Sequence, residues 1–178
     1  MTKKNLIITE QQFQDLIKNL MSSIFGDKKF DFNFDFFGKK TDLSNATDKE
    51  FYQELLKKVD APVTDENLKF MYAWRQSEGK AGKFNPFNTT QKMPGATNFN
   101  SVGVKNYTSK QDGLEATVKT LKNGRYNCIL DGLKNDIGAK KISTKCLSDL
   151  KTWGTGDLVA KVVSSYESGS KPKPQSLS

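Results

Sequence analysis

A long stretch rich in Gly, Asn and Pro, from Gly79 to Tyr107, constrains the fold of this chain more than any other feature. It separates two segments whose apolar residues recur at helical spacing. A connection of this length in a compact domain rarely lacks structure of its own. We therefore predict that it contains short strands or forms the wall of a binding site. One carboxylate, Glu78, stands where the preceding helix runs into this loop.

Helix signals flank the loop on both sides. Thr64 and Ser109 are suitable N-cap residues in front of amphipathic segments, and Gly124 ends the second of them. The predicted helices cover 48–58, the segment from Thr64 to Glu78, the segment from Ser109 to Gly124, 125–135, 144–153 and 156–167. Residues 46–167 are thus expected to form one small, mainly helical domain, of α+β character if the loop forms a short hairpin.

Residues 1–45 show two further patterns. Helical periodicity over 10–25 predicts an amphipathic helix. A strict alternation then places four aromatic side chains on one face of an extended arm, namely Phe30, Phe32, Phe34 and Phe36. Because soluble monomers seldom expose such a stripe, the arm either lies on the domain or docks onto another protein. Residues 168–178 are rich in Ser, Pro and Lys and predict a flexible tail.

The composition excludes several kinds of chemistry. The chain has no histidine, which excludes Ser-His-Asp and Cys-His nucleophiles and His-ligated zinc. Two cysteines, Cys128 and Cys146, are too few for a site of four thiolates; they either pair or, as we prefer, are small buried apolar residues. Neither a metal nor a cofactor is predicted, and acid–base chemistry is left to carboxylates, Tyr and Lys.

The net charge of +8 favours anionic partners, such as nucleic acid, acidic lipids or wall polymers. The lysines are scattered, and no basic helix with interleaved aromatics is visible, so no specific binding of nucleic acid is predicted. No apolar run after Met1 is long enough for a signal peptide or a membrane span.

The order of motifs across residues 66–135 resembles the lysozyme superfamily. After Glu78 come Asn85-Pro86-Phe87-Asn88-Thr89-Thr90, then Gly103-Val104-Lys105-Asn106-Tyr107, and finally a helix that closes with Asn123-Gly124-Arg125-Tyr126. This order is similar to that of bacterial glucosaminidases and lytic transglycosylases. It is closer still to small domains found in bacteriophage virion proteins and wall hydrolases. The resemblance spans the central half of the chain, and Ser77 stands where those domains have Ala.

The resemblance implies a lysozyme-like fold and cleavage of the glycan strands of peptidoglycan. Glu78 would protonate the departing glycosidic oxygen, and Tyr107 would brace the intermediate or the acid. The residues that would contact the sugars are Trp74, Asn85, Asn88, Thr89 and Thr90. Each of these has a structural alternative, since Asn and Thr side chains also satisfy loop backbone groups, and Trp74 and Tyr107 would equally suit the core.

One departure from that pattern affects the mechanism. The glucosaminidases carry a second acid between the Asn-rich turn and the Tyr, whereas residues 91–106 contain neither Asp nor Glu. A mechanism with two carboxylates is therefore poorly supported. An enzyme of this kind would use Glu78 as its single acid, with help from the substrate. We interpret the nearest other carboxylate, Asp112, as an N-terminal residue of the next helix.

These patterns leave more than one function open. The first is a bacteriophage-associated protein, made in the bacterial host cytoplasm and carried in the virion, that degrades peptidoglycan. The second is a non-catalytic structural component of the baseplate, tail or head that retains a lysozyme-like fold. The third is an endolysin that acts late in infection. Expected partners are peptidoglycan strands and, through the aromatic arm, other virion proteins.

Overall fold

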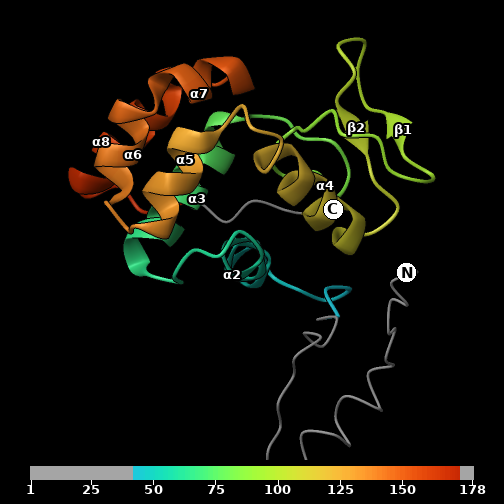
Figure 1. The fold of residues 1–178 in the computed structure, drawn as a ribbon, viewed down its shortest axis with the longest axis horizontal. Coiled ribbons are helices and arrows are strands. Elements are labelled where there is room, and N and C mark those ends of the chain that lie inside the picture. The colour runs from blue at the N-terminus through green and yellow to red at the C-terminus, as the bar shows by residue number, and fades with distance from the viewer. Residues whose placement is uncertain (1–41, 173–178) are drawn as a thin grey trace, which may run out of the picture. The chain divides into compact units, whose positions relative to one another are not determined.

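Seven helices and one two-stranded sheet make up residues 42–172, the part of the chain that the computed structural model describes (Figure 1). The helices are α2 (Asp48–Lys58), α3 (Asp65–Ser77), α4 (Lys110–Leu121), α5 (Asn127–Lys134), α6 (Ala139–Lys145), α7 (Leu147–Trp153) and α8 (Leu158–Glu167). Strands β1 (Thr97–Asn98) and β2 (Lys105–Asn106) pair antiparallel, with Thr97 opposite Asn106. The predictions of a mainly helical domain and of short strands in the long loop are confirmed.

Three predicted features lie outside the described residues. They are the helix over 10–25, the arm with Phe30, Phe32, Phe34 and Phe36, and the end of the tail from residue 173. Within residues 42–172, no helix combines the length and the apolar character needed to cross a membrane.

The helix starts follow the capping residues that the sequence suggests. Thr64 Oγ1 accepts a hydrogen bond of 3.1 Å from the backbone N–H of Asn67, and Ser109 Oγ accepts one of 3.1 Å from that of Asp112. Asp112 therefore lies in the first turn of α4, where a negative charge is favourable, as we interpreted it. Thr47 forms a full capping box with Glu50 at the start of α2, a cap that was not predicted.

The region around the two cysteines differs from the prediction. In place of one helix over 144–153, α6 and α7 meet at Cys146, and α6 already begins after Gly138, whose φ is +93°. The expectation of unpaired cysteines was wrong, because Cys128 and Cys146 form a disulfide with their Cα atoms 5.4 Å apart. Packing of α5 against α6 and α7 brings the two cysteines together. No local sequence pattern predicts this contact between helices.

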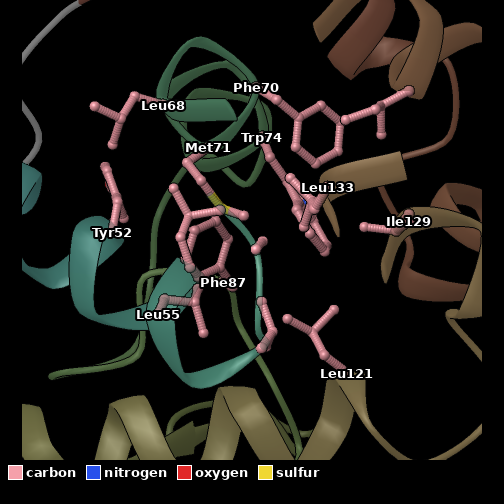
Figure 2. Packing of buried hydrophobic residues seen from close by; sticks show 14 of the residues in the cluster. Tyr52, Leu55, Leu68, Phe70, Met71, Trp74, Phe87, Leu121, Ile129 and Leu133 are labelled. Atoms are coloured by element: carbon pink, nitrogen blue, oxygen red, sulfur yellow. The ribbon is translucent and has the colours of Figure 1, made fainter. Parts of the chain in front are cut away.

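Helix α3 runs through the centre of the apolar core, as Figure 2 shows. Phe70, Met71 and Trp74 on this helix are at most 1% exposed. Around them gather Tyr52 and Leu55 of α2, Leu121 of α4, Ile129 and Leu133 of α5, and Phe87 of the long loop. Trp74, in the last turn of α3, therefore belongs to this core, and Glu78 follows the end of the helix directly.

The long loop packs directly against α4 because of a glycine in that helix. A Cβ atom at Gly113 would lie 1.7 Å from the backbone oxygen of Phe84, and one at Gly82 would lie 2.3 Å from that of Lys105. Only glycine permits such close approach of two backbones. These contacts fix the loop on the face of the domain next to the end of α3.

Candidate functional site

Glu78 is the C-cap residue of α3. Its backbone N–H lies 3.2 Å from the carbonyl oxygens of both Trp74 and Arg75, and the chain then turns away at Gly79, whose φ is +63°. The carbonyl groups at a helix C-terminus carry partial negative charge, which disfavours an ionised carboxylate nearby. The backbone alone thus places Glu78 where its neutral form is preferred.

The Glu78 side chain is half-buried, and one of its two carboxyl oxygens is shielded from water. Its Oε1 atom is buried and has no hydrogen-bond partner among the described residues. Burial raises the pKa of Glu78 to about 8, so most of the molecules hold this proton at neutral pH. The Asn88 amide, the two indole N–H groups of Trp153 and Trp74, and the charge of Arg75 lower the pKa, but by less than burial raises it.

The two indole groups act on Glu78 as nearby dipoles rather than as bonded donors. Trp74 Nε1 is buried and has no hydrogen-bond partner in the part of the chain that the structure describes, and Trp153 Nε1 donates to the backbone oxygen of Phe87 at 2.8 Å. Neither therefore forms a hydrogen bond of good geometry to the carboxyl group. Glu78 Oε1 and Trp74 Nε1 are thus both buried without a hydrogen-bond partner among the described residues, and buried polar atoms of this kind call for an explanation.

Aromatic rings form the apolar side of the site. The ring of Trp74 lies 4.7 Å from that of Trp153 and 5.2 Å from that of Phe87, and Trp153 lies 4.8 Å from Tyr126. Trp74 is only 1% exposed and belongs to the core, which was one of the two interpretations of this residue. Trp153 was not predicted to lie at this site, although it is one of only two tryptophans in the chain.

Asn88 ties the loop to the end of α3. Its side-chain amide donates to the backbone oxygens of Glu78 at 3.3 Å and Lys80 at 3.1 Å, and its oxygen accepts from the N–H of Gly82. The residue has a φ of +52°, a conformation that Asn tolerates better than most residues. Asn88 is thus brought to Glu78 by the fold, as the motif order suggests.

Asn85, Thr89 and Tyr107 serve the architecture of the loop. The Asn85 amide donates to the oxygens of Thr89 at 2.9 Å and Lys105 at 2.7 Å, and its oxygen accepts from the Thr89 N–H at 2.9 Å. The Thr89 hydroxyl pairs with that of Thr120 on α4. Asn85 and Thr89 are buried, so in this structure they hold the loop rather than face a ligand.

Tyr107 forms its side-chain hydrogen bonds with the backbone of the loop rather than with Glu78. Its hydroxyl donates to the backbone oxygen of Gln91 at 2.8 Å, the side chain is 3% exposed, and burial raises the pKa of Tyr107 to about 12. The interpretation as a packed residue fits these contacts. Thr90 is exposed, and its contact with sugar stays a prediction.

Glu78 is the carboxyl group with a raised pKa at this site. Residues 91–106 supply no acid, and Asp112 is hydrogen-bonded to Thr108 and Ser109 at the start of α4. Within residues 42–172, no group of three or more Cys, Asp or Glu side chains is placed to hold a metal ion. The chemistry that this arrangement offers is proton transfer from a single buried carboxyl group.

No family model, no curated protein and no solved structure matches this chain. A function must therefore be derived from the geometry of the site and from the motif order in the sequence.

Proposed function

We propose that this protein cleaves glycosidic bonds in the glycan strands of peptidoglycan, with Glu78 as a single general acid. The observation that carries the proposal is the Oε1 atom of Glu78, which is buried and has no hydrogen-bond partner within residues 42–172, together with the rise of the pKa of Glu78 to about 8. A general acid must hold its proton at the pH at which the enzyme works. Protonation of the departing oxygen is the step that needs such a group.

The missing second carboxylate defines the rest of the mechanism. As Glu78 protonates the leaving oxygen, the glycosidic carbon gains positive charge, and a group of the substrate itself attacks this carbon. If that group is the 6-hydroxyl, its proton passes to the Glu78 carboxylate, which restores the acid for the next cycle. Both halves of the reaction then need one protein carboxyl group.

Two further observations support this proposal. A helix that ends in the acid, a loop with a short sheet and a following set of helices is the order that the resemblance to the lysozyme superfamily implies. The disulfide between Cys128 and Cys146 suits a protein that works outside a reducing cytoplasm, since disulfides persist in virions and at cell surfaces. We accordingly propose a bacteriophage virion as its location.

Clearing of purified peptidoglycan tests the proposal. Wild type should lower the turbidity of the suspension, and Glu78→Gln, which keeps the shape but cannot donate a proton, should be slower by about 100-fold or more. Glu167→Gln is the matched control, because Glu167 forms only an exposed ion pair with Lys140. Equal clearing by Glu78→Gln and wild type would show that Glu78 is not the general acid. If wild type clears nothing, the proposed enzymatic activity is contradicted.

One observation favours a second candidate, a non-catalytic structural component of the baseplate, tail or head. The polar groups of Asn85, Thr89 and Tyr107 are occupied by loop contacts, which leaves fewer groups for sugar binding. Presence of the protein in purified particles, combined with intact glycan strands after incubation, would support this candidate. Muropeptide mass analysis is the readout for intact strands.

A further inference from the structure

The loop that follows Glu78 carries positive charge that forms no ion pair with an acid within residues 42–172. Between Gly79 and Gln111 the sequence has five lysines and no Asp or Glu. The ion pairs between described residues all involve lysines outside this segment. Lysines in a folded domain are usually interspersed with acids, so a segment of one sign indicates a surface suited to an anionic partner.

Backbone contacts bring three of these lysines, Lys80, Lys83 and Lys105, onto one scaffold, which we name the lysine face. The carbonyl oxygen of Lys83 accepts from the N–H of Tyr107 at 2.9 Å, and the N–H of Lys83 donates to Asn106 Oδ1 at 2.8 Å. The close approach of Gly82 to the Lys105 oxygen adds a third link. The chain before the Asn-rich turn and strand β2 thus lie side by side (Figure 1).

The lysine face is also linked to the backbone of Glu78. The Asn88 amide donates to the carbonyl oxygens of both Glu78 and Lys80, so one side chain joins the acid to the first lysine of the face. A polymer held on the lysine face would therefore pass next to Glu78. Because Glu78 is largely protonated at neutral pH, it would not repel an anionic polymer there.

Partly buried aromatic rings support two of these lysines. Lys80 Nζ lies 5.8 Å from the centre of the Phe99 ring, and Lys83 Nζ lies 5.0 Å from that of Phe84. The Lys105 ammonium donates to Asn98 Oδ1, which is neutral. Cation–π contacts and neutral hydrogen bonds orient the ammonium groups without cancelling their charge. The charge remains available to a ligand.

The lysine face binds anionic groups of the bacterial wall polymer, we propose, and holds the polymer beside Glu78. This inference rests on the proposed function for the identity of the polymer. The groups are carboxylates of the peptide stems or phosphodiesters of attached polymers, which share the chemistry of closely spaced single negative charges. Both arginines of the chain lie outside the segment from Gly79 to Gln111, which fits point-charge attraction rather than the bidentate reading of nucleic-acid bases.

Co-sedimentation with purified cell wall tests the inference, with Glu78→Gln present in every variant so that the polymer stays intact. The test variant adds Lys80→Gln, Lys83→Gln and Lys105→Gln. The matched control adds Lys141→Gln, Lys145→Gln and Lys151→Gln on α6 and α7, exposed lysines without ion pairs in residues 42–172, on the far side of Figure 1 from β1 and β2.

Binding by the test variant should be about tenfold weaker at low salt than binding by the control, since each exposed charge contributes only a few-fold. Raising the salt should remove most of this difference, because exposed charges are screened. Equal binding by the two variants, with both folded by circular dichroism, would overturn the inference.

Chemical treatment of the wall distinguishes the two sources of charge. Loss of the lysine-dependent binding after amidation of the carboxyl groups assigns the carboxylates. Loss after acid extraction of phosphodiester-linked polymers assigns the phosphodiesters. Lysine-dependent binding that survives both treatments would overturn the inference.

The outcome is separable from that of the proposed function. If wild type clears the wall through Glu78 but the two triple variants bind equally, the proposed function stands and the lysine face does not. If wild type clears nothing but binding depends on the lysine face, the protein binds the wall without cutting it.

Discussion

The core around α3 and the loop from Gly79 to Tyr107 are stabilised by different means. The core excludes water with large apolar side chains, such as Phe70 and Trp74. The loop contains little regular structure, and side chains such as Asn85 satisfy its backbone groups instead. Glu78 lies where the two regions meet, and both regions determine the surroundings of its carboxyl group. The core keeps its carboxyl group dry, and the loop brings a polar neighbour.

The difference between the core and the loop explains how a small domain can raise the pKa of a carboxyl group. A carboxyl group in the middle of the core would cost too much, and one in the middle of the loop would be solvated. At the end of α3, the carboxyl group follows a helix whose last turn is fixed by packing, so it is held at the boundary of water. The predictions below separate the two regions.

The largest loss of stability should come from the core. Phe70→Ala removes a side chain that is 0% exposed, and the cavity should lower the free energy of unfolding by about 4 kcal/mol. Urea denaturation measures this change. Val63→Ala, at a position 39% exposed, is the control and should cost under about 0.5 kcal/mol. A loss of less than about 1 kcal/mol for Phe70→Ala would place the centre of the core elsewhere.

The next largest effect should be a dependence of the free energy of unfolding on pH, which comes from Glu78 at the boundary between the core and the loop. The pKa of Glu78 is about 8 in the folded protein and 4.5 in its ordinary state, so the folded protein holds more protons than the unfolded chain between these values. The contribution of Glu78 to stability is therefore greatest below pH 4.5 and is lost as the pH rises to about 8. Between pH 5 and 8, wild type should lose roughly 3 kcal/mol, as measured by urea denaturation.

Glu78→Gln should not show this loss. The chain has no histidine and, with both cysteines in the disulfide, no titrating thiol, so apart from the α-amino group little else titrates in this range. The carboxyl groups with a lowered pKa, such as Glu66, titrate at lower pH, and Tyr107 titrates at higher pH. Equal slopes for wild type and Glu78→Gln would contradict a buried, protonated Glu78.

The loop should respond locally. Asn85→Ala leaves backbone groups of Thr89 and Lys105 without partners and should cost about 2 kcal/mol. Hydrogen exchange should speed up first between residues 83 and 107, while the amides of α3 stay protected. Asn45→Ala, at an exposed position before α2, is the control. Uniform loss of protection in α3 and the loop would show that the two regions open together.

The smallest effect should come from Trp153→Phe, which keeps a ring against Trp74 but removes the indole N–H. Loss of the hydrogen bond to the Phe87 oxygen should cost about 1 kcal/mol. Because the Trp153 N–H lowers the pKa of Glu78, the substitution should raise this pKa further. A fall in the pKa of Glu78, measured by NMR, would show that Trp153 acts mainly through burial instead.

The sequence predicts those parts of the structure that depend on neighbours along the chain. The N-caps Thr64 and Ser109, the bounds of the first described helix, the short strands in the loop and the place of Glu78 at a helix end all follow from local patterns. The disulfide between Cys128 and Cys146 does not, because it depends on how α5 packs against α6 and α7.

The sequence predicts Glu78 as the candidate acid of the site, but it does not predict which residues surround Glu78. Glu78 stands out by position, whereas Trp153 reaches it from α7, far along the chain. Asn85 and Asn88 look alike in the sequence, yet only Asn88 contacts the Glu78 backbone. Which polar side chain of a loop faces the backbone and which faces a ligand is decided by tertiary contacts that no residue pattern contains.

The most direct measurement is the titration of the Glu78 side chain itself. The carboxyl carbon of Glu78 can be followed by NMR between pH 4 and 10 and assigned by its absence in Glu78→Gln. We predict a midpoint near pH 8 for this carboxyl group. A midpoint near pH 4.5, that of an exposed Glu, would contradict a dry, protonated acid at the end of α3 and with it the proposed role in catalysis.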